Sequence, residues 1–204
     1  VYEWNDKGVG TYINSNTARG GSRTLENEYT DILNIGRIFD VEEKAQAMVD
    51  EMQAQVADTL AAALNTVLAP LEAKGLRLTV DCPEGLTLPH DPKWTAEALS
   101  NLLDNAVKYN KHNGRVTLNV ENLPEGVTLT VTDTGIGIPQ ADVDRVFERF
   151  YRVDKSHSKE IGGTGLGLSI VQWIVSLHNG QITVHSTYGQ GTLVTVALPT
   201  QPSA

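Results

Sequence analysis

The run Gly162-Gly163-Thr164-Gly165-Leu166-Gly167-Leu168, which opens an apolar stretch, constrains this chain more than any other feature. A helix N-terminus presents unpaired amides and the positive end of the helix dipole, and glycines let an anion approach the backbone. We interpret the run as a phosphate cradle at the start of a helix that spans about 166–178. It lacks the Gly-Lys-Ser/Thr of a Walker A loop, and its alternating glycines lie too late in the chain for a dinucleotide fingerprint.

Composition excludes several classes of protein. The chain has 204 residues, a formal net charge of -9 and 40% hydrophobic residues, which is typical of one principal soluble domain with a smaller second element. The negative charge argues against nucleic acid or an anionic membrane as a partner. We expect no direct membrane contact, because no apolar stretch reaches the roughly 20 residues of a membrane span. Cys82 is interpreted as a small apolar filler, and neither it nor the histidines show metal-ligand spacing.

The first third of the chain predicts a linker and a helix. Residues 1–23 mix Gly, Asn and Thr without period, which favours a flexible junction or a cloning scar. From Val41 to Lys74 the apolar residues recur every three or four positions, which predicts one long helix that stops at Gly75. This stripe could form a dimer seam, but packing on the same chain satisfies it equally well, and we favour packing on the same chain and a monomer.

The remaining pattern predicts an α/β fold. Strands are expected near 76–80, 115–122, 127–133, 181–186 and 192–198, with a turn at 123–126. Helices are expected from the capping pair Asp91-Pro92 to Tyr109, over about 140–147, and over 166–178. We expect a two-layer sandwich in which helices pack on one mixed sheet.

Three polar residues share one face of the predicted helix after Pro92. Asn101, Asn105 and Lys108 follow at i, i+4 and i+7, beside the stripe that would be buried. Asparagine is a poor residue for a helix interior, and its amide oxygen can bind Mg²⁺ while lysine attracts phosphate. A solvated helix face is the alternative interpretation.

A second glycine motif, Asp133-Thr134-Gly135-Ile136-Gly137, follows a predicted strand. The Asp133 carboxylate could accept a hydrogen bond from the exocyclic amine of adenine, and the glycines would let the base approach. Taken alone, the motif also describes an ordinary tight turn.

Charged and aromatic residues alternate between the two glycine motifs. We interpret this segment as a mobile lid over a triphosphate, with Arg152 as its functional cation. The alternative is a solvated loop whose aromatic residues, Phe147, Phe150 and Tyr151, anchor it to the core, and for these three residues we favour that alternative.

Taken in order, these segments resemble the catalytic ATP-binding domain of sensor histidine kinases, a branch of the group shared with gyrase, Hsp90 and MutL. Residues 101–109 resemble the N box, 133–138 the first glycine box and 147–152 the F box; 163–167 and 189–192 resemble the remaining glycine boxes. The resemblance implies a Bergerat-type fold over 75–200, with a short tail at 201–204. It implies a site for ATP and Mg²⁺ formed by Asn101, Asn105, Lys108, Tyr109, Asp133, Gly135, Gly137, Gly163, Gly165, Leu166, Gly167 and Thr192.

The same resemblance implies roles for individual residues. Asp133 would bind adenine and Asn105 the metal. Asn101 and Lys108 would face the phosphates, with Tyr109 beside the nucleotide, and Arg152 would steady the γ-phosphoryl group, so Arg152 and Lys108 are the expected catalytic residues.

The chain departs from the family pattern before the catalytic domain. No histidine precedes His90, although the family places a histidine followed by an acidic residue in a dimerising hairpin. We interpret 24–74 as a helical segment that could be a remnant of this hairpin, and we expect phosphoryl transfer to the histidine of a separate dimerisation domain, with a response regulator as a further partner. The resemblance implies a cytoplasmic location, as part of a larger bacterial sensor. A non-enzymatic, nucleotide-responsive regulatory module and an ATP-hydrolysing clamp are the competing functions.

Overall fold

The computed structural model describes residues 25–52, 56–86, 88, 90–153 and 164–199. The helices are α2 (Leu25–Ile38), α3 (Glu42–Met52), α4 (Val56–Asn65), α5 (Leu68–Ala73), α6 (Pro92–Lys108), α7 (Gln140–Val143) and α9 (Gly167–Leu177). The strands are β1 (Arg77–Asp81), β2 (Arg115–Leu123), β3 (Gly126–Asp133), β4 (Gln181–Thr187) and β5 (Gly191–Pro199). The short helix expected over about 140–147 is therefore shorter than predicted and ends at Val143.

The strands form one mixed five-stranded sheet in the order β1-β2-β3-β5-β4. β1 is parallel to β2, whereas β2, β3, β5 and β4 pair antiparallel. Pro124 and Glu125 make the turn between β2 and β3, because Leu123 already pairs with Gly126. The predicted mixed sheet is thus confirmed.

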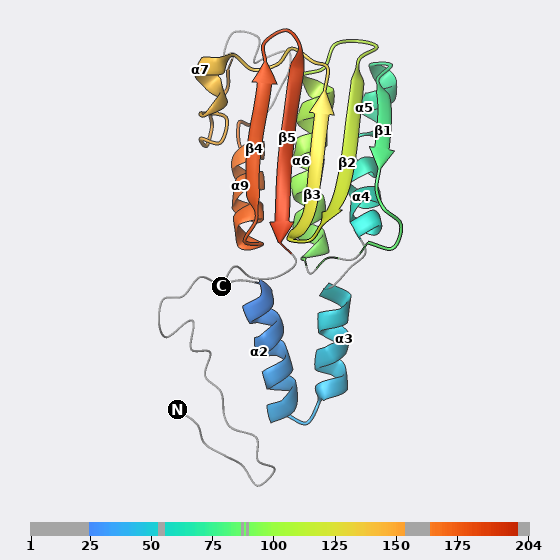
Figure 1. Cartoon of the computed structure of the whole chain (residues 1–204), viewed down its shortest axis with the longest axis vertical. Coiled ribbons are helices and arrows are strands. Elements are labelled where there is room, and N and C mark those ends of the chain that lie inside the picture. Colours follow the sequence, from blue (N-terminus) through green and yellow to red (C-terminus); the bar gives the residue numbers. More distant parts are fainter. Residues whose placement is uncertain (1–24, 53–55, 87, 89, 154–163, 200–204) are drawn as a thin grey trace.

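Helices cover one face of this sheet and leave the other without a helix in the described part of the chain (Figure 1). The residues of β2 and β3 that point to the helices, such as Val116, Leu118 and Val131, are buried, and the threonines between them are more exposed. This alternation is the usual pattern for a sheet with one solvated face. The result is the predicted two-layer α/β sandwich, with α6 packed against α4 and α9.

The long helix predicted from Val41 to Lys74 is divided into α3, α4 and α5. Pro70 explains the break between α4 and α5, because a proline ring clashes with the carbonyl four residues earlier, here that of Thr66 in the turn. The apolar stripe nevertheless packs on the same chain as expected, with Leu60, Val67 and Leu71 buried. Gly75, at φ 63°, ends α5 as predicted.

The helices α2 and α3 form a hairpin beyond the sandwich (Figure 1). They approach closely at Gly36, where a Cβ would overlap the Cβ of Ala45, and the amide of Val41 donates to the carbonyl of Gly36 over 2.8 Å.

Among the described helices, none combines the length and the apolar composition that a membrane span requires.

Candidate functional site

The helix α6 carries the predicted polar stripe along the border of the core. Asp91 caps it as expected, since its Oδ1 accepts from the amides of Lys93 at 2.9 Å and Trp94 at 3.0 Å. Asn101, Asn105 and Lys108 are half-buried on the face beside the buried leucines. The stripe is therefore not a fully solvated face.

The N-terminus of α9 lies against this stripe. A Cβ on Gly167 would lie 3.0 Å from Asn101 Oδ1 and 3.8 Å from Asn105 Nδ2. Asn101 Nδ2 donates to Glu97 O at 2.9 Å and Glu97 Oε1 at 3.2 Å, which leaves its amide oxygen facing Gly167. Leu166 stands at the N-cap without a side-chain hydrogen bond to the first turn. Two amide side chains and a helix N-terminus therefore converge, an arrangement suited to binding phosphate oxygens.

Asp133 stands at the end of β3 and is held by the backbone. Its Oδ1 accepts from the amide of Gly135 at 2.7 Å, and the amide of Thr192 donates to the same carboxylate. Burial raises the pKa of Asp133, and the two backbone donors oppose this shift. The carboxylate is thus fixed in position and partly removed from water.

The first glycine box, residues 133–138, joins Asp133 to the end of α6. A Cβ on Gly135 would overlap the carbonyl oxygen of Tyr109, and the amide of Ile136 donates to that oxygen over 3.0 Å. Gly137, at φ 65°, is also required, because a Cβ there would overlap the carbonyl oxygen of Thr187. The motif is therefore more than an isolated tight turn: it connects α6 and β4.

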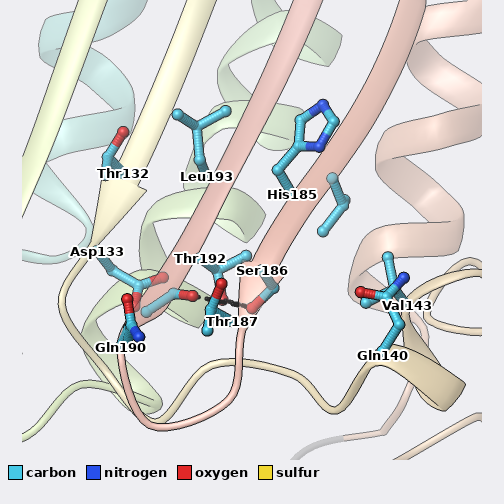
Figure 2. Close-up of a pocket in the computed structure, with 12 residues that line it drawn as sticks. Thr132, Asp133, Gln140, Val143, His185, Ser186, Thr187, Gln190, Thr192 and Leu193 are labelled. Carbon is cyan, nitrogen blue, oxygen red and sulfur yellow. Dashed lines mark hydrogen bonds between the residues drawn. The ribbon is translucent and has the colours of Figure 1, made fainter.

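A cavity of about 420 Å³ opens at this end of the sheet (Figure 2). Its lining comes from β3, β4, β5, the turn between β4 and β5, and α7: Thr132, Asp133, Gln140, Val143, Val184, His185, Ser186, Thr187, Gln190, Gly191, Thr192 and Leu193. Asn101, Asn105 and Lys108 do not line it. The predicted site residues therefore fall into two groups, with Asp133 and Thr192 at the cavity and the α6 residues beside the start of α9.

The segment 147–152 packs on Gly165, in the described part of the glycine run that leads into α9. The amide of Phe150 donates to Gly165 O over 2.9 Å, and Gly165, at φ 72°, packs against the backbone of Phe150 and Tyr151. Tyr151 donates a short hydrogen bond to Asp142, and Arg145 lies 4.1 Å from the centre of its ring.

The expectation that all three aromatic residues of this segment anchor it is wrong for Phe150. Its side chain is 72% exposed, and its backbone has a φ of 64°, which is uncommon for a bulky residue. The hydrogen bond from its amide to Gly165 O turns the backbone so that the side chain points outward. Phe147 and Tyr151 are half-buried, as an anchoring role requires.

Comparison with known proteins assigns this arrangement to a family. The profile described as "Histidine kinase-, DNA gyrase B-, and HSP90-like ATPase" matches residues 90–202, which is more than half of the chain. The chain belongs to this family. Its mixed sheet and helices match the Bergerat-type fold of histidine kinase catalytic domains, as predicted.

Individual relatives are sensor kinases. The sensor protein kinase WalK of Staphylococcus aureus is 44% identical over 111 residues, which are 53% of this chain and 27% of WalK. The mycobacterial sensor histidine kinase MprB is 28% identical, with a TM-score of 0.58 over 71% of this chain and 95% of that structure. Full-length ShkA, solved in complex with AMPPNP, has a TM-score of 0.63 at 22% identity over 84% of this chain and 40% of ShkA, a likeness of fold alone. The match to WalK thus spans about a quarter of that relative.

Most of the predicted site residues lie in the described part of the chain. Lys108 and Tyr109 are half-buried at the end of α6, with the Lys108 Nζ 5.8 Å from the centre of the Tyr109 ring. Arg152 is half-buried directly after Tyr151. Gly163 and the part of the predicted lid that contains Lys155 and Lys159 lie outside the described residues.

The donor set of this ATPase site fits Mg²⁺ held mainly by a nucleotide. No group of three or more His, Cys, Asp or Glu side chains suited to a metal ion occurs in the described ranges. Magnesium commonly takes one or two protein oxygens and completes its shell with phosphate oxygens and water. Asn105, half-buried beside the start of α9, offers one such oxygen.

Sequence reasoning missed two residues that organise the site. Ser186 of β4 accepts from the amide of Ile138 and donates to Gly191 O beside the cavity, and Lys74 bonds to the end of α6. The strand period of β4 places Ser186 on the helix-facing side, which was a usable signal. The contacts of Lys74 join residues more than thirty positions apart, and no local pattern announces them.

Proposed function

We propose that this chain is the catalytic domain of a two-component sensor histidine kinase, which binds Mg-ATP and transfers its γ-phosphoryl group to a histidine. The convergence of Asn101 and Asn105 with the N-terminus of α9, together with the Asp133 carboxylate held at the cavity, carries this proposal. It provides separate places for the phosphates and for the base. The AMPPNP bound to ShkA, which has the same fold, adds support.

Each group of residues has a distinct task in this function. The Asp133 carboxylate accepts from the amino group of adenine, and Tyr109 lies beside the nucleotide. Asn101, Lys108 and the first amides of α9 bind and orient the phosphates, while Asn105 holds the magnesium ion. When bound, that ion supplies charge neutralisation of the phosphates.

The transfer step requires an imidazole from another segment. The bond between the γ-phosphorus and the β,γ-bridging oxygen breaks, a bond from phosphorus to the imidazole nitrogen forms, and ADP leaves. Arg152 stabilises the charge on the transferred group.

Two of this chain's own histidines are poor acceptors. His90 and His178 are 1% and 8% exposed, and both are hydrogen-bonded through both ring nitrogens. In this proposal the acceptor lies on the hairpin of a dimerisation domain, which would pass the phosphoryl group to a response regulator. The chain would then act as a cytoplasmic part of a larger sensor, and the match to the sensor protein kinase WalK covers 27% of that longer protein.

Calorimetric titration with ATP or ADP in the presence of Mg²⁺ tests the nucleotide site. We expect the chain to bind both nucleotides, and Asp133→Asn and Asn105→Ala to weaken binding at least tenfold, because each removes a direct ligand. Asn119→Ala, on the helix-free face of the sheet, is the matched control and should bind like the parent. Absence of binding by the parent chain would refute the proposal.

Transfer is tested separately with γ-labelled ATP. A histidine-containing hairpin domain taken from a sensor kinase such as WalK is added in trans, and acid-labile label should appear on it. Arg152→Ala should reduce the rate by two or more orders of magnitude, by analogy with other cations that stabilise a transferring phosphoryl group. ATP binding with no label on any acceptor hairpin would instead favour the non-enzymatic module.

A further inference from the structure

The hydroxyl group of Ser186 stands at the centre of a hydrogen-bond chain beside Asp133. Ser186 Oγ donates to Gly191 O over 2.9 Å and accepts from the amide of Ile138 over 2.8 Å. Ser186 Oγ also lies 3.0 Å from the Oγ1 of Thr192, and Thr192 is the residue paired with Ser186 on β5 (Figure 2). The Ser186 side chain therefore connects the first glycine box, through Ile138, with Gly191 and Thr192.

Counting protons fixes the direction of the bond between the two hydroxyl groups. A hydroxyl group has one proton to donate and two lone pairs to accept with. Ser186 gives its proton to Gly191 O, a carbonyl that can only accept. The proton in the 3.0 Å contact must therefore come from Thr192. Its hydroxyl is left with lone pairs alone for anything else that it meets.

This direction of the hydrogen bond makes the side chains of Asp133 and Thr192 both acceptors toward the cavity. Asp133 and Thr192 both line the cavity, and the Asp133 carboxylate already accepts from the amides of Gly135 and Thr192. A carboxylate has further lone pairs to offer, and Thr192 Oγ1 has its own beside them. A ligand that reaches this wall meets acceptors from both side chains.

We propose that Ser186 is a specificity-determining residue, which holds the Thr192 hydroxyl as an acceptor and so makes the cavity select a 6-amino over a 6-oxo purine. This inference rests on the proposed function and extends it to a residue that does not itself touch the base. Adenine presents an amino donor at position 6, whereas hypoxanthine presents a carbonyl oxygen there. A site built around hydrogen-bond partners discriminates strongly when a mismatched group leaves them unpaired.

The test compares the affinities for Mg-ADP and Mg-IDP, because these ligands keep the same ribose and diphosphate and differ in the 6-position group and the N1 proton that accompanies it. The parent should prefer ADP. In Ser186→Ala the Thr192 hydroxyl is free to rotate and donate, so the preference should fall about fivefold, as expected for one lost hydrogen bond. Thr192→Val should give a similar fall, and the double variant should fall no further than Thr192→Val alone.

Two matched controls lie outside the hydrogen-bond chain. Ser176→Ala, on the exposed face of α9, and Thr195→Val, on the helix-free face of the sheet, should keep the preference of the parent. Circular dichroism checks that each variant is folded.

The outcomes separate this inference from the proposed function. A parent chain that binds neither ADP nor IDP would refute the nucleotide site itself. Binding of ADP by the parent, with Ser186→Ala weakening ADP and IDP equally, would mean that Ser186 only supports the fold. If Ser186→Ala does not fold, Thr192→Val decides alone, and an unchanged preference in it overturns the inference.

Discussion

At the scale of single residues, His178 is held in a neutral form that shapes the stability of the domain. Its Nδ1 lies 2.8 Å from Ile174 O and therefore carries the proton, while its Nε2 accepts from the amide of Asp91 over 3.1 Å. A protonated ring would place a second proton against that amide. Burial, the largest cause, lowers the pKa of His178.

His90 repeats this arrangement on the neighbouring loop. Its Nδ1 donates to Leu88 O over 2.6 Å, and its Nε2 lies 2.9 Å from Thr59 Oγ1 of α4. Burial again lowers the pKa of His90, with the backbone hydrogen bond to Leu88 opposing it and the nearby His178 adding to it. The two imidazoles therefore connect α4, α6 and α9, and the bond that His178 accepts from Asp91 exists only while that ring is neutral.

We expect the free energy of unfolding to fall as the pH drops from about 7.5 to 5.5. In the unfolded chain both imidazoles take up protons near pH 6.5, and the folded state binds them less readily, so stability is complete above that pH and lost below it. The loss should be of the order of 1 kcal/mol for each imidazole. Urea denaturation at each pH gives the free energy, and His178→Gln should reduce the pH dependence.

The control for this prediction is His185→Gln on exposed β4, which should retain the full dependence. Asp133 acts in the opposite direction, because its raised pKa favours the folded state at low pH. It is common to the parent and both variants, so differences between them isolate the imidazoles. Equal pH dependence in the parent and His178→Gln would contradict the assignment.

At the scale of elements, Lys74 bonds to the end of α6, the helix that carries the proposed phosphate-binding amides of Asn101 and Asn105. Its Nζ donates to the carbonyl oxygens of Val107 at 2.9 Å, Lys108 at 2.7 Å and Asn110 at 3.4 Å. The last carbonyls of a helix lack partners within it, and a cation there also favours the negative end of the helix dipole. The adjacent Tyr109 carbonyl accepts from Ile136, so the same helix end supports the first glycine box.

Lys74→Met should lower the free energy of unfolding by about 1–2 kcal/mol, because it removes charge-assisted hydrogen bonds to a helix end. It should also weaken ADP binding several-fold by loosening the last turn of α6, where Lys108 lies. Urea denaturation and calorimetry measure the two effects. The control is Lys111→Met, which removes an exposed lysine just beyond the helix. An equal loss of stability in both variants would contradict the role of Lys74 at the end of α6.

At the scale of the whole molecule, residue periods were sufficient to predict the sandwich. The alternation of β2 and β3, and the cap at Asp91, each follow from a local rule that the packing does not override. Pro70 is also a local signal for an interruption of the helix predicted over 41–74, although the regular apolar stripe around it favours one continuous helix. For Phe150 no local rule predicts the outward side chain, because the hydrogen bond of its amide to Gly165 sets its backbone.

The candidate site was predictable as a set of residue types but not as a hydrogen-bond network. Asparagines at helical spacing and glycines before a helix indicate a phosphate-binding site through local geometry. The bonds around Ser186, by contrast, depend in part on Ile138, which lies 48 positions earlier and reaches Ser186 only in the folded chain. No local pattern predicts a contact of this range.

The pairing of β3 with β5 at the centre of the sheet has a consequence for folding. β2 and β3 are joined by a two-residue turn and can pair locally, whereas Thr132 finds its partner Leu193 only after the whole intervening segment has been looped out. Closing such a loop costs chain entropy before any contact rewards it, so pairings of this range form slowly. Asp133 and Thr192 lie at the mouth of that loop. A refolding chain therefore brings Asp133 and Thr192, the proposed base-binding residues, together only when the loop closes, and binding of a nucleotide would favour this long-range step of folding.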